Sequence, residues 1–143
     1  MAKFFGVCGV LFRWRSNSLQ VLLVVEEAGD DLTGKRPGMI TIPMGHQEEF
    51  ETPEEAIIRE FREEAALGVE IGHPIEDFTE YPTTNGPMQL RAFVVKAKKG
   101  EPIHSAHGEL KTLWMKVDEF FALSDEKIRP LSKEIVRRAL TQH

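Results

Sequence analysis

The sequence predicts an α/β (α+β) fold in which a mixed β-sheet lies between helices. Apolar runs bounded by turn-forming residues outnumber helical patterns, which makes a sheet the expected central element. At least two pairs of these runs are close enough in sequence to be antiparallel neighbours, and helical patterns separate or follow the others. The chain has 143 residues, of which 41% are hydrophobic and 29% charged. This is globular composition and a length for one domain, expected over residues 1–143.

The first third of the chain predicts a hairpin, a long loop and a short strand. Ser16-Asn17-Ser18 separates apolar runs at 4–14 and 19–25, a spacing typical of a β-hairpin. Residues 26–38 are polar and rich in glycine and aspartate, so a loop is expected there. Residues 39–42 form a short apolar run that fits a strand.

The first apolar run is expected to be a buried strand with Cys8 as core filling. Arg13-Trp14-Arg15 follows the run, where a secretory signal would have a small-residue cleavage site. The run is also too short to span a bilayer, so no membrane association is expected.

A helix is predicted from Thr52 to Ala66. Thr52 fits the N-cap, Pro53 the first helical position and Glu55 the third, and Gly68 is close enough to stop the helix. The rest of the chain predicts an irregular segment with strand potential at its ends, two strands, a short helical turn capped by Asp118, and an amphipathic C-terminal helix. These elements are expected at 69–81, 88–97, 112–117, 118–121 and 130–141.

Charge and cysteine content exclude several classes of protein. The formal net charge is −5, which argues against a nucleic-acid-binding surface because phosphate binding needs a basic face. One cysteine excludes an intramolecular disulfide framework and a cysteine-built metal cluster. A reducing, cytoplasmic location is therefore expected. The acidity is local, because residues 48–64 contain eight Glu and two Arg, a net of −6, and the remainder has a net of +1.

The predicted helix places Glu60, Glu63 and Glu64 on one edge, because they are spaced i, i+3 and i+4. An apolar face of Ile57, Ile58, Phe61 and Ala65 lies to one side of this edge. Neighbouring carboxylates repel one another, and Arg59 can reach Glu55 or Glu63 but not all three acids. Mg²⁺ prefers oxygen ligands and bridges carboxylates to phosphate, so the edge suggests a magnesium–phosphate site. A bare triplet of this kind is also typical of a solvated acidic face.

The segment 45–67 resembles the Nudix box of the Nudix hydrolases, G-x5-E-x7-R-E-U-x-E-E-x-G-U, in which U is bulky and apolar. Six of the seven fixed identities occur at the required spacing: Gly45, Glu51, Arg59, Glu60, Glu63 and Glu64. Phe61 and Leu67 take the two apolar positions. The sequence departs from the pattern at Ala66, where the family has Gly, and Met44 stands where many members have a second Gly. Gly68 is expected to absorb the turn that the family glycine makes.

The resemblance implies an α/β/α sandwich and hydrolysis of nucleoside diphosphates linked to another moiety. The resemblance also extends to residues 109–120, where an acidic residue precedes a Trp-bearing strand and a turn of Asp, Glu and a hydrophobic residue. Carried over, Glu60, Glu63 and Glu64 are the expected Mg²⁺ ligands, with Mn²⁺ as a substitute, and the Gly45 carbonyl is a further candidate. Arg59 would orient Glu51 or a ligand carboxylate. The preferred general base is Glu60 or Glu63, with Glu109 as the later-loop alternative.

Other candidate residues rest on weaker patterns. Lys35, Arg36 and Arg91 are candidates for phosphate binding and His46 for substrate contact, although each also fits a surface position. Phe5, Phe12 and Tyr81 are candidates for base stacking, with core packing favoured for the phenylalanines, and Trp114 is expected in the core. His104 and His107 have no further His or Cys nearby, which argues against zinc.

The identity of the substrate stays open at this level. Pro82 resembles a marker of ADP-ribose-type members, and Tyr81 lies close to a marker of dinucleoside polyphosphate members. A nucleoside triphosphate is an equal candidate. The expected partner is thus a small nucleotide-type molecule, with no nucleic acid and no membrane, and the chain is expected to be a monomer or homodimer. A non-catalytic Nudix-fold binding or regulatory module is the alternative function, although its usual mark, lost box glutamates, is absent.

Overall fold

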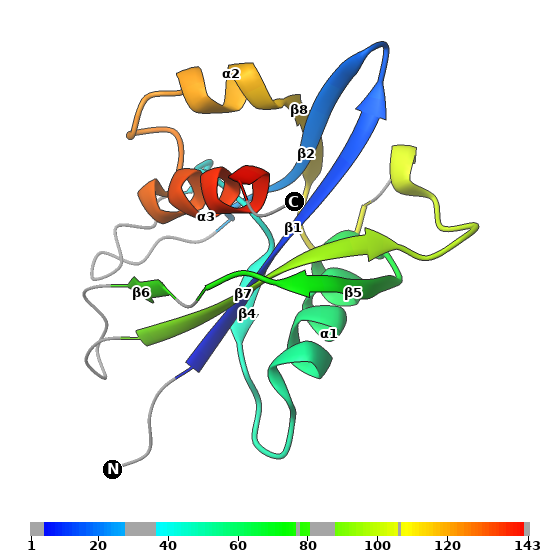
Figure 1. The fold of residues 1–143 in the computed structure, drawn as a ribbon, viewed down its shortest axis with the longest axis vertical. Helices are drawn as coiled ribbons and strands as arrows, with labels where there is room; N and C mark the ends of the chain where they lie inside the picture. The colour runs from blue at the N-terminus through cyan, green and yellow to red at the C-terminus, as the bar shows by residue number, and fades with distance from the viewer. Residues whose placement is uncertain (1–4, 28–36, 77, 81–87, 106, 142–143) are drawn as a thin grey trace.

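The computed structural model describes residues 5–27, 37–76, 78–80, 88–105 and 107–141. A mixed β-sheet forms its centre, and helices cover both faces (Figure 1). The strands are β1(Phe5–Arg15), β2(Ser18–Val25), β3(Ile40–Thr41), β4(Met44–His46), β5(Val69–Pro74), β6(Phe78–Glu80), β7(Met88–Ala97) and β8(Thr112–Lys116). The helices are α1(Pro53–Ala65), α2(Val117–Ala122) and α3(Pro130–Thr141), with a 3₁₀ turn η1(Ile103–Ser105). The predicted fold class is confirmed.

Strand β1 organises the sheet because it pairs with three others. Its first half runs antiparallel to β4, with Val7 opposite Gly45, and its last residues run antiparallel to β2, with Arg13 opposite Gln20. Along its other edge it runs parallel to β7 as far as Leu11. β8 extends the sheet beyond β2, β3 pairs with the end of β2 on the edge that β1 also uses, and β5 and β6 extend the sheet beyond β7.

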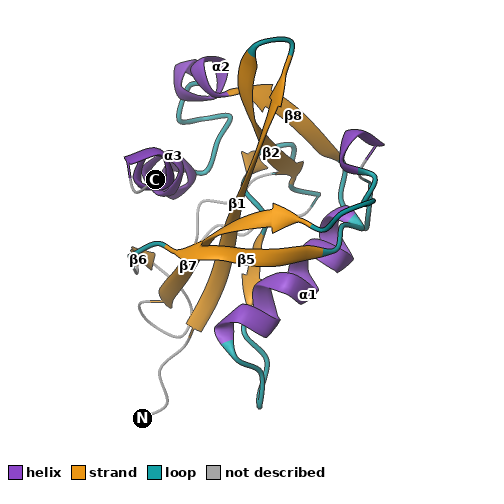
Figure 2. Ribbon diagram, turned by 45° about the vertical axis from the view of Figure 1, so that its right-hand side comes forward, coloured by secondary structure: helices purple, strands orange, loops and turns teal. Residues whose placement is uncertain are grey.

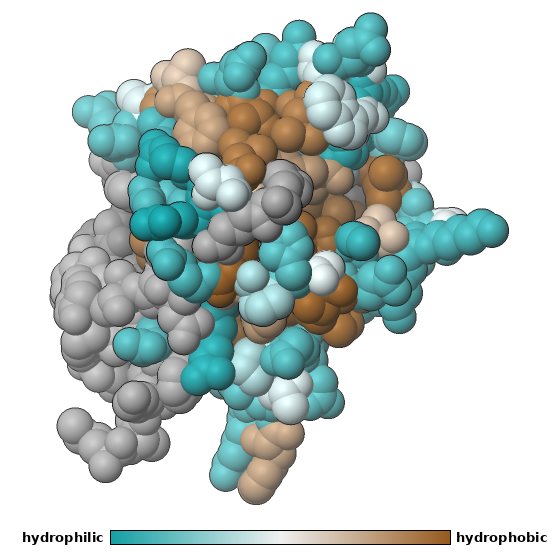
Figure 3. All heavy atoms as spheres, viewed as in Figure 1, coloured by the Kyte–Doolittle hydropathy of each residue, from teal (hydrophilic) through white to brown (hydrophobic). Residues whose placement is uncertain are grey.

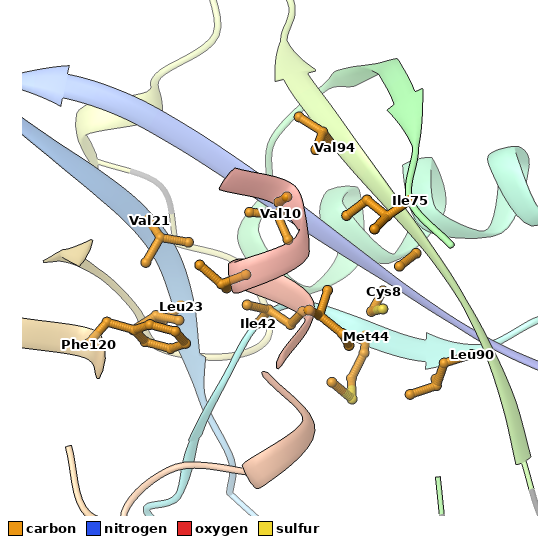
Figure 4. Packing of buried hydrophobic residues seen from close by; sticks show 14 of the residues in the cluster. Cys8, Val10, Val21, Leu23, Ile42, Met44, Ile75, Leu90, Val94 and Phe120 are labelled. Carbon is orange, nitrogen blue, oxygen red and sulfur yellow. The ribbon is translucent and has the colours of Figure 1, made fainter. Parts of the chain in front are cut away.

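Two hydrophobic clusters lie on opposite faces of the sheet because β1 side chains alternate between them. Cys8 and Val10 point into the cluster that α2 and α3 cover, and Figure 4 shows its labelled side chains gathered near α3. Val7 and Leu11 point into the cluster that α1 covers. Figure 2 shows α1 on one side of the sheet and α2 and α3 on the other. Burial of Cys8 in the core is confirmed.

Several predicted elements match closely, and others need correction. The strand at 88–97 and the helix at 130–141 are confirmed. The expected strand at 39–42 is present as the two-residue β3, and a further short strand that was not predicted, β4, follows it and contains Gly45. The expected cap at Asp118 is wrong, because α2 starts one residue earlier and Lys116 stands at its N-cap without a side-chain hydrogen bond.

The surface combines polar and apolar areas. In the view of Figure 3 apolar residues gather in the upper half, in the region that α2, α3 and β2 occupy in Figure 1. Among the described residues, no helix is both long and apolar enough to cross a membrane.

Candidate active site

The helix α1 begins at a complete capping box. The backbone N–H of Glu55 donates to Thr52 Oγ1 at 3.1 Å, and the N–H of Thr52 donates to Glu55 Oε1 at 3.0 Å. Pro53 follows the cap, where its fixed φ suits the first turn. Two donors that the helix leaves unsatisfied are thus paired, and the helix start is fixed relative to the preceding loop.

The helix ends at Ala66, which adopts the left-handed conformation with φ 54° and ψ 37°. Its N–H donates to the carbonyl of Arg62 at 3.1 Å, the 5→1 bond of an αL motif, and the N–H of Leu67 donates to the carbonyl of Phe61 at 3.3 Å. The expectation that Gly68 would absorb this turn is wrong, because Gly68 does not have a positive φ. A Cβ at Gly68 would lie 2.6 Å from Nη2 of the exposed Arg62 side chain, which could move aside.

Arg59 ties the helix to the loop that precedes it. Its Nε and Nη2 donate to the two oxygens of Glu51 at 2.7 and 3.0 Å, a bidentate pair, and Nη2 also donates to the His46 carbonyl at 3.0 Å. The guanidinium lowers the pKa of the Glu51 carboxyl through these hydrogen bonds, and Glu51 raises the pKa of Arg59 in turn. Glu51 and Arg59 therefore act as a clamp between loop and helix.

The remaining nitrogen of Arg59 faces the acidic edge of the helix. Nη1 donates to Glu60 Oε1 at 2.9 Å and to Glu63 Oε2 at 3.2 Å, and lies 3.7 Å from Glu48 Oε1. Arg59 thus reaches Glu63, as expected, together with Glu60, whereas Glu55 is engaged in the cap. One cation offsets part of the repulsion between neighbouring carboxylates.

Glu60 is buried, with 8% of its surface exposed. Burial raises the pKa of its carboxyl, the Arg59 guanidinium opposes this shift, the Glu63 charge adds to it, and a hydrogen bond with the Glu64 carboxyl lowers the pKa. The carboxylate lies directly against the backbone of Gly45, where an alanine Cβ would overlap it. The helical pattern placed Glu60 on a polar edge, whereas the structure turns this edge toward β4.

A loop distant in sequence docks on the last turn of α1. The backbone N–H groups of Glu109 and Leu110 donate to the carbonyls of Glu63 and Glu64 at 2.8 and 3.2 Å. Gly108 permits this approach, because a Cβ there would lie 2.6 Å from the Glu63 carbonyl oxygen. The exposed Glu109 is therefore brought to the helix that carries the acidic edge. Sequence reasoning missed the contribution of Gly108, and its position before an acidic residue gave no local signal.

The remaining candidates for substrate binding lie at different places in the structure, and some lie outside the described residues. His46 is exposed at the end of β4 and joins the site through its carbonyl. Arg91 lies on β7 and lines a pocket of about 220 Å³ together with Pro53 and Glu54 at the start of α1. Phe12 packs against the cluster under α3. Four candidates lie outside the described residues, namely Lys35, Arg36, Tyr81 and Pro82, and so does the side chain of Phe5.

The acidic edge of α1 offers oxygen ligands to a divalent cation. Within the described residues no three His, Cys, Asp or Glu side chains converge to enclose a metal ion, and Arg59 bridges Glu60 and Glu63. The donor chemistry nevertheless fits, because Glu60, Glu63 and Glu64 offer only oxygen, which suits Mg²⁺ or Mn²⁺. The bare backbone of Gly45 also accommodates the Glu60 carboxylate, which a side chain at that position would displace.

Comparison with known proteins identifies the family. A family model for the NUDIX domain matches residues 5–139. The chain belongs to the Nudix family. As a Nudix hydrolase it is an enzyme that acts on phosphorus-containing acid anhydrides, a pyrophosphohydrolase. A search of curated proteins finds no match.

Solved structures show the same Nudix fold at low sequence identity. A NUDIX hydrolase from Nitrosomonas europaea is 19% identical with a TM-score of 0.76, over 98% of this chain and 90% of that one. A C. elegans Ap4A hydrolase in a binary complex is 18% identical with a TM-score of 0.70, over 96% of both chains. The NUDIX domain of Shewanella oneidensis NrtR in complex with ADP ribose is 18% identical with a TM-score of 0.68, over 98% and 90%.

Proposed function

We propose that this Nudix hydrolase uses Mg²⁺, or Mn²⁺ in its place, to cleave a diphosphate linkage in a nucleoside diphosphate joined to another moiety. The observation that carries the proposal is the placement of the acidic edge: the Glu51–Arg59 clamp fixes α1 so that Glu60 lies against the bare backbone of Gly45. Three carboxylates on one edge with one arginine among them retain negative charge that a cation would balance.

Glu60, Glu63 and Glu64 would hold the cation, with the Gly45 carbonyl as a further ligand. When bound, such a cation neutralises diphosphate charge and lowers the pKa of a coordinated water. Arg59 holds the Glu60 and Glu63 carboxylates in place and is itself held by Glu51. Exchange of these carboxylate contacts from Arg59 to the cation requires only side-chain motion, because the backbone is fixed at both ends of the helix.

A carboxylate must accept the proton of the attacking water. Glu60 or Glu63 remains the preferred base, and Glu109 is the alternative that the docked loop supplies. Glu63 and Glu109 are exposed, so either can reach a water on the solvent side, whereas Glu60 is buried. Lys35, Arg36, His46 and Arg91 remain proposals for substrate binding.

The proposed substrates are the nucleotide compounds named for structural neighbours, together with nucleoside triphosphates. The printed names of structural neighbours include an Ap4A hydrolase, a domain complexed with ADP ribose and a UDP-X diphosphatase. Dinucleoside polyphosphates, ADP-ribose-like compounds and nucleoside triphosphates therefore all belong in the test. A single domain over residues 1–143 and a cytoplasmic location remain predictions.

The test is a Mg²⁺-dependent hydrolysis screen over these compounds and nucleotide sugars. Wild type is compared with Glu63→Gln and with Glu49→Gln, which makes the same charge change at an exposed residue of the loop before α1. We expect turnover of at least one compound, a loss of about 100-fold or more in Glu63→Gln, and wild-type turnover in Glu49→Gln. Equal turnover in all three proteins would refute the proposed site. Tight binding of a nucleotide without turnover would favour the non-catalytic alternative.

A Glu109→Gln variant separates the candidates for the base. If Glu109 accepts the proton, kcat falls in this variant whereas Mg²⁺ affinity is unchanged. If Glu63 or Glu60 accepts it, Glu109→Gln keeps nearly the wild-type kcat.

A further inference from the structure

Strands β1 and β7 separate beyond Leu11, and a pocket opens between them. Their parallel pairing ends at Leu11 opposite Val95, after which β1 pairs only with β2 and β7 only with β5. The pocket has a volume of about 250 Å³. Its walls are mainly apolar and include Leu11, Phe12, Val94, Val95, Ile103 and Trp114. None of the lining residues belongs to the segment 45–67 that forms the acidic site.

Two arginines converge beside this pocket on a single histidine nitrogen. Arg13 Nη1 lies 2.8 Å and Arg15 Nη1 lies 3.5 Å from His104 Nδ1. Neither arginine forms an ion pair within the part of the chain that the structure describes. Burial lowers the pKa of Arg13, and the neighbouring charge of Arg15 adds to this shift.

Trp114 and Ile103 connect the two arginines to the pocket. Arg13 stacks over the Trp114 ring, with its Cζ 4.2 Å from the ring centroid, and Trp114 also lines the pocket. The Trp114 indole N–H donates to the Ile103 carbonyl at 2.7 Å, and Ile103 both lines the pocket and precedes His104. The apolar cavity and the cationic groups are therefore parts of one surface.

The sheet register extends the positive charge across three strands. Arg13 on β1 lies opposite Gln20 on β2, and Gln20 lies opposite Lys116 on β8. Arg13 Nε also donates to Gln20 Oε1 at 2.7 Å, which holds its guanidinium along this row. An anion placed beside Arg13 and Arg15 would balance two neighbouring positive charges that have no carboxylate partner among the described residues.

We infer that the gap between β1 and β7 binds a second small ligand, in which a phosphate group is joined to a flat apolar group, as in a nucleoside monophosphate. The phosphate would contact Arg13 and Arg15, whose planar guanidinium groups suit phosphate oxygens. The flat group would enter the pocket beside Trp114. A pocket of this volume lies just below the usual range for small-ligand sites, so it fits one base rather than a dinucleotide. The site does not depend on the proposed metal chemistry.

The test follows the indole N–H signals of the two tryptophans by NMR during titration. EDTA is present throughout, so that the acidic helix holds no cation and recruits no phosphate. The probes are adenosine monophosphate, adenosine and inorganic phosphate, and a Trp14→Phe variant assigns the Trp114 signal. We expect the monophosphate to shift the Trp114 signal and to bind more tightly than either of its parts.

Two variants test the cationic part. Arg15→Gln removes an exposed charge and is expected to weaken the monophosphate about tenfold, since a hydrogen bond to a charged group contributes at least that much. Arg137→Gln makes the same change on α3, across the sheet, and is expected to bind as wild type does. An unmoved Trp114 signal, or equal affinity in wild type and Arg15→Gln, would overturn the inference. Inorganic phosphate binding as tightly as the monophosphate would overturn the role of the pocket.

Discussion

Replacement of Gly45 by alanine should disable the acidic site without unfolding the protein. Gly45 does not need the conformational freedom of glycine, because its φ is not positive. Its lack of a side chain is what the structure requires, since a Cβ would lie 2.6 Å from Glu60 Oε2 and closer still to Oε1. Ordinary contact begins near 3.4 Å and the nearest atom, Oε1, would lie at 2.2 Å, so the carboxylate would have to move by about 1.2 Å.

Glu60 has little freedom to make this movement. It is buried, and its Oε1 accepts a hydrogen bond from Arg59 at 2.9 Å. A displacement of about 1 Å in a positioned group already costs on the order of 100-fold in rate. We therefore expect Gly45→Ala to lower kcat/KM on the order of 100-fold and to weaken Mn²⁺ binding, measured by isothermal titration calorimetry. The free energy of unfolding should change by less than about 1 kcal/mol, because alanine is compatible with a strand.

Gly100→Ala provides the matched control. Gly100 has a φ of +87° with open space around its Cα, so alanine there is strained but touches nothing. This variant should lose about 1 kcal/mol of stability and keep wild-type Mn²⁺ affinity and turnover. Wild-type metal binding in Gly45→Ala would refute the reasoning, and so would a loss of activity that only matches its unfolded fraction.

Three further predictions concern the clamp and the helix ends. Ala66→Gly should raise the free energy of unfolding by about 0.5–1 kcal/mol in urea denaturation, because glycine relieves the left-handed backbone. Ala65→Gly, inside the helix, should lower the free energy of unfolding by about 1 kcal/mol or more. A change of the same sign in both variants would contradict this reasoning. Thr52→Ala should lose about 1 kcal/mol in the same assay, since the capping box is broken, and an unchanged midpoint would count against the box. Glu51→Gln should be less stable than wild type by about 1–2 kcal/mol at pH 7. Because Arg59 holds the Glu51 pKa below its usual value, this difference should be complete above about pH 4.5 and disappear as the pH falls through the lowered pKa; a constant difference down to pH 3 would contradict the clamp.

Local patterns account for the elements that sequence predicted well. The start of α1 follows from Thr52, Pro53 and Glu55, which are within four positions of one another and interact directly. The strand β7 and the helix α3 likewise follow from apolar periodicity that each segment carries on its own. Such features need no information from distant parts of the chain.

The elements that were missed depend on distant contacts. β4 is three residues long and contains Gly45, so it has no usable periodicity, and its pairing with residues 6–8 of β1 makes it a strand. The burial of Glu60 also depends on β4, whereas a helical wheel shows only that it lies beside Glu63 and Glu64. Ala66 adopts the left-handed turn although Gly68 was available, because the bonds to Arg62 and Phe61 require the turn at that residue.

A single pair of hydrogen bonds completes the end of α1 and holds Glu109 against the helix. The last carbonyls of a helix have no partner within it, and those of Glu63 and Glu64 are paired with N–H groups of Glu109 and Leu110. The side chains of the same two glutamates belong to the acidic edge. The backbone of Glu63 and Glu64 thus positions the loop, and the same two residues carry carboxylates of the proposed cation site. Because Gly108 allows this contact, a larger residue there should move Glu109 away from the helix while Arg59 still holds Glu60.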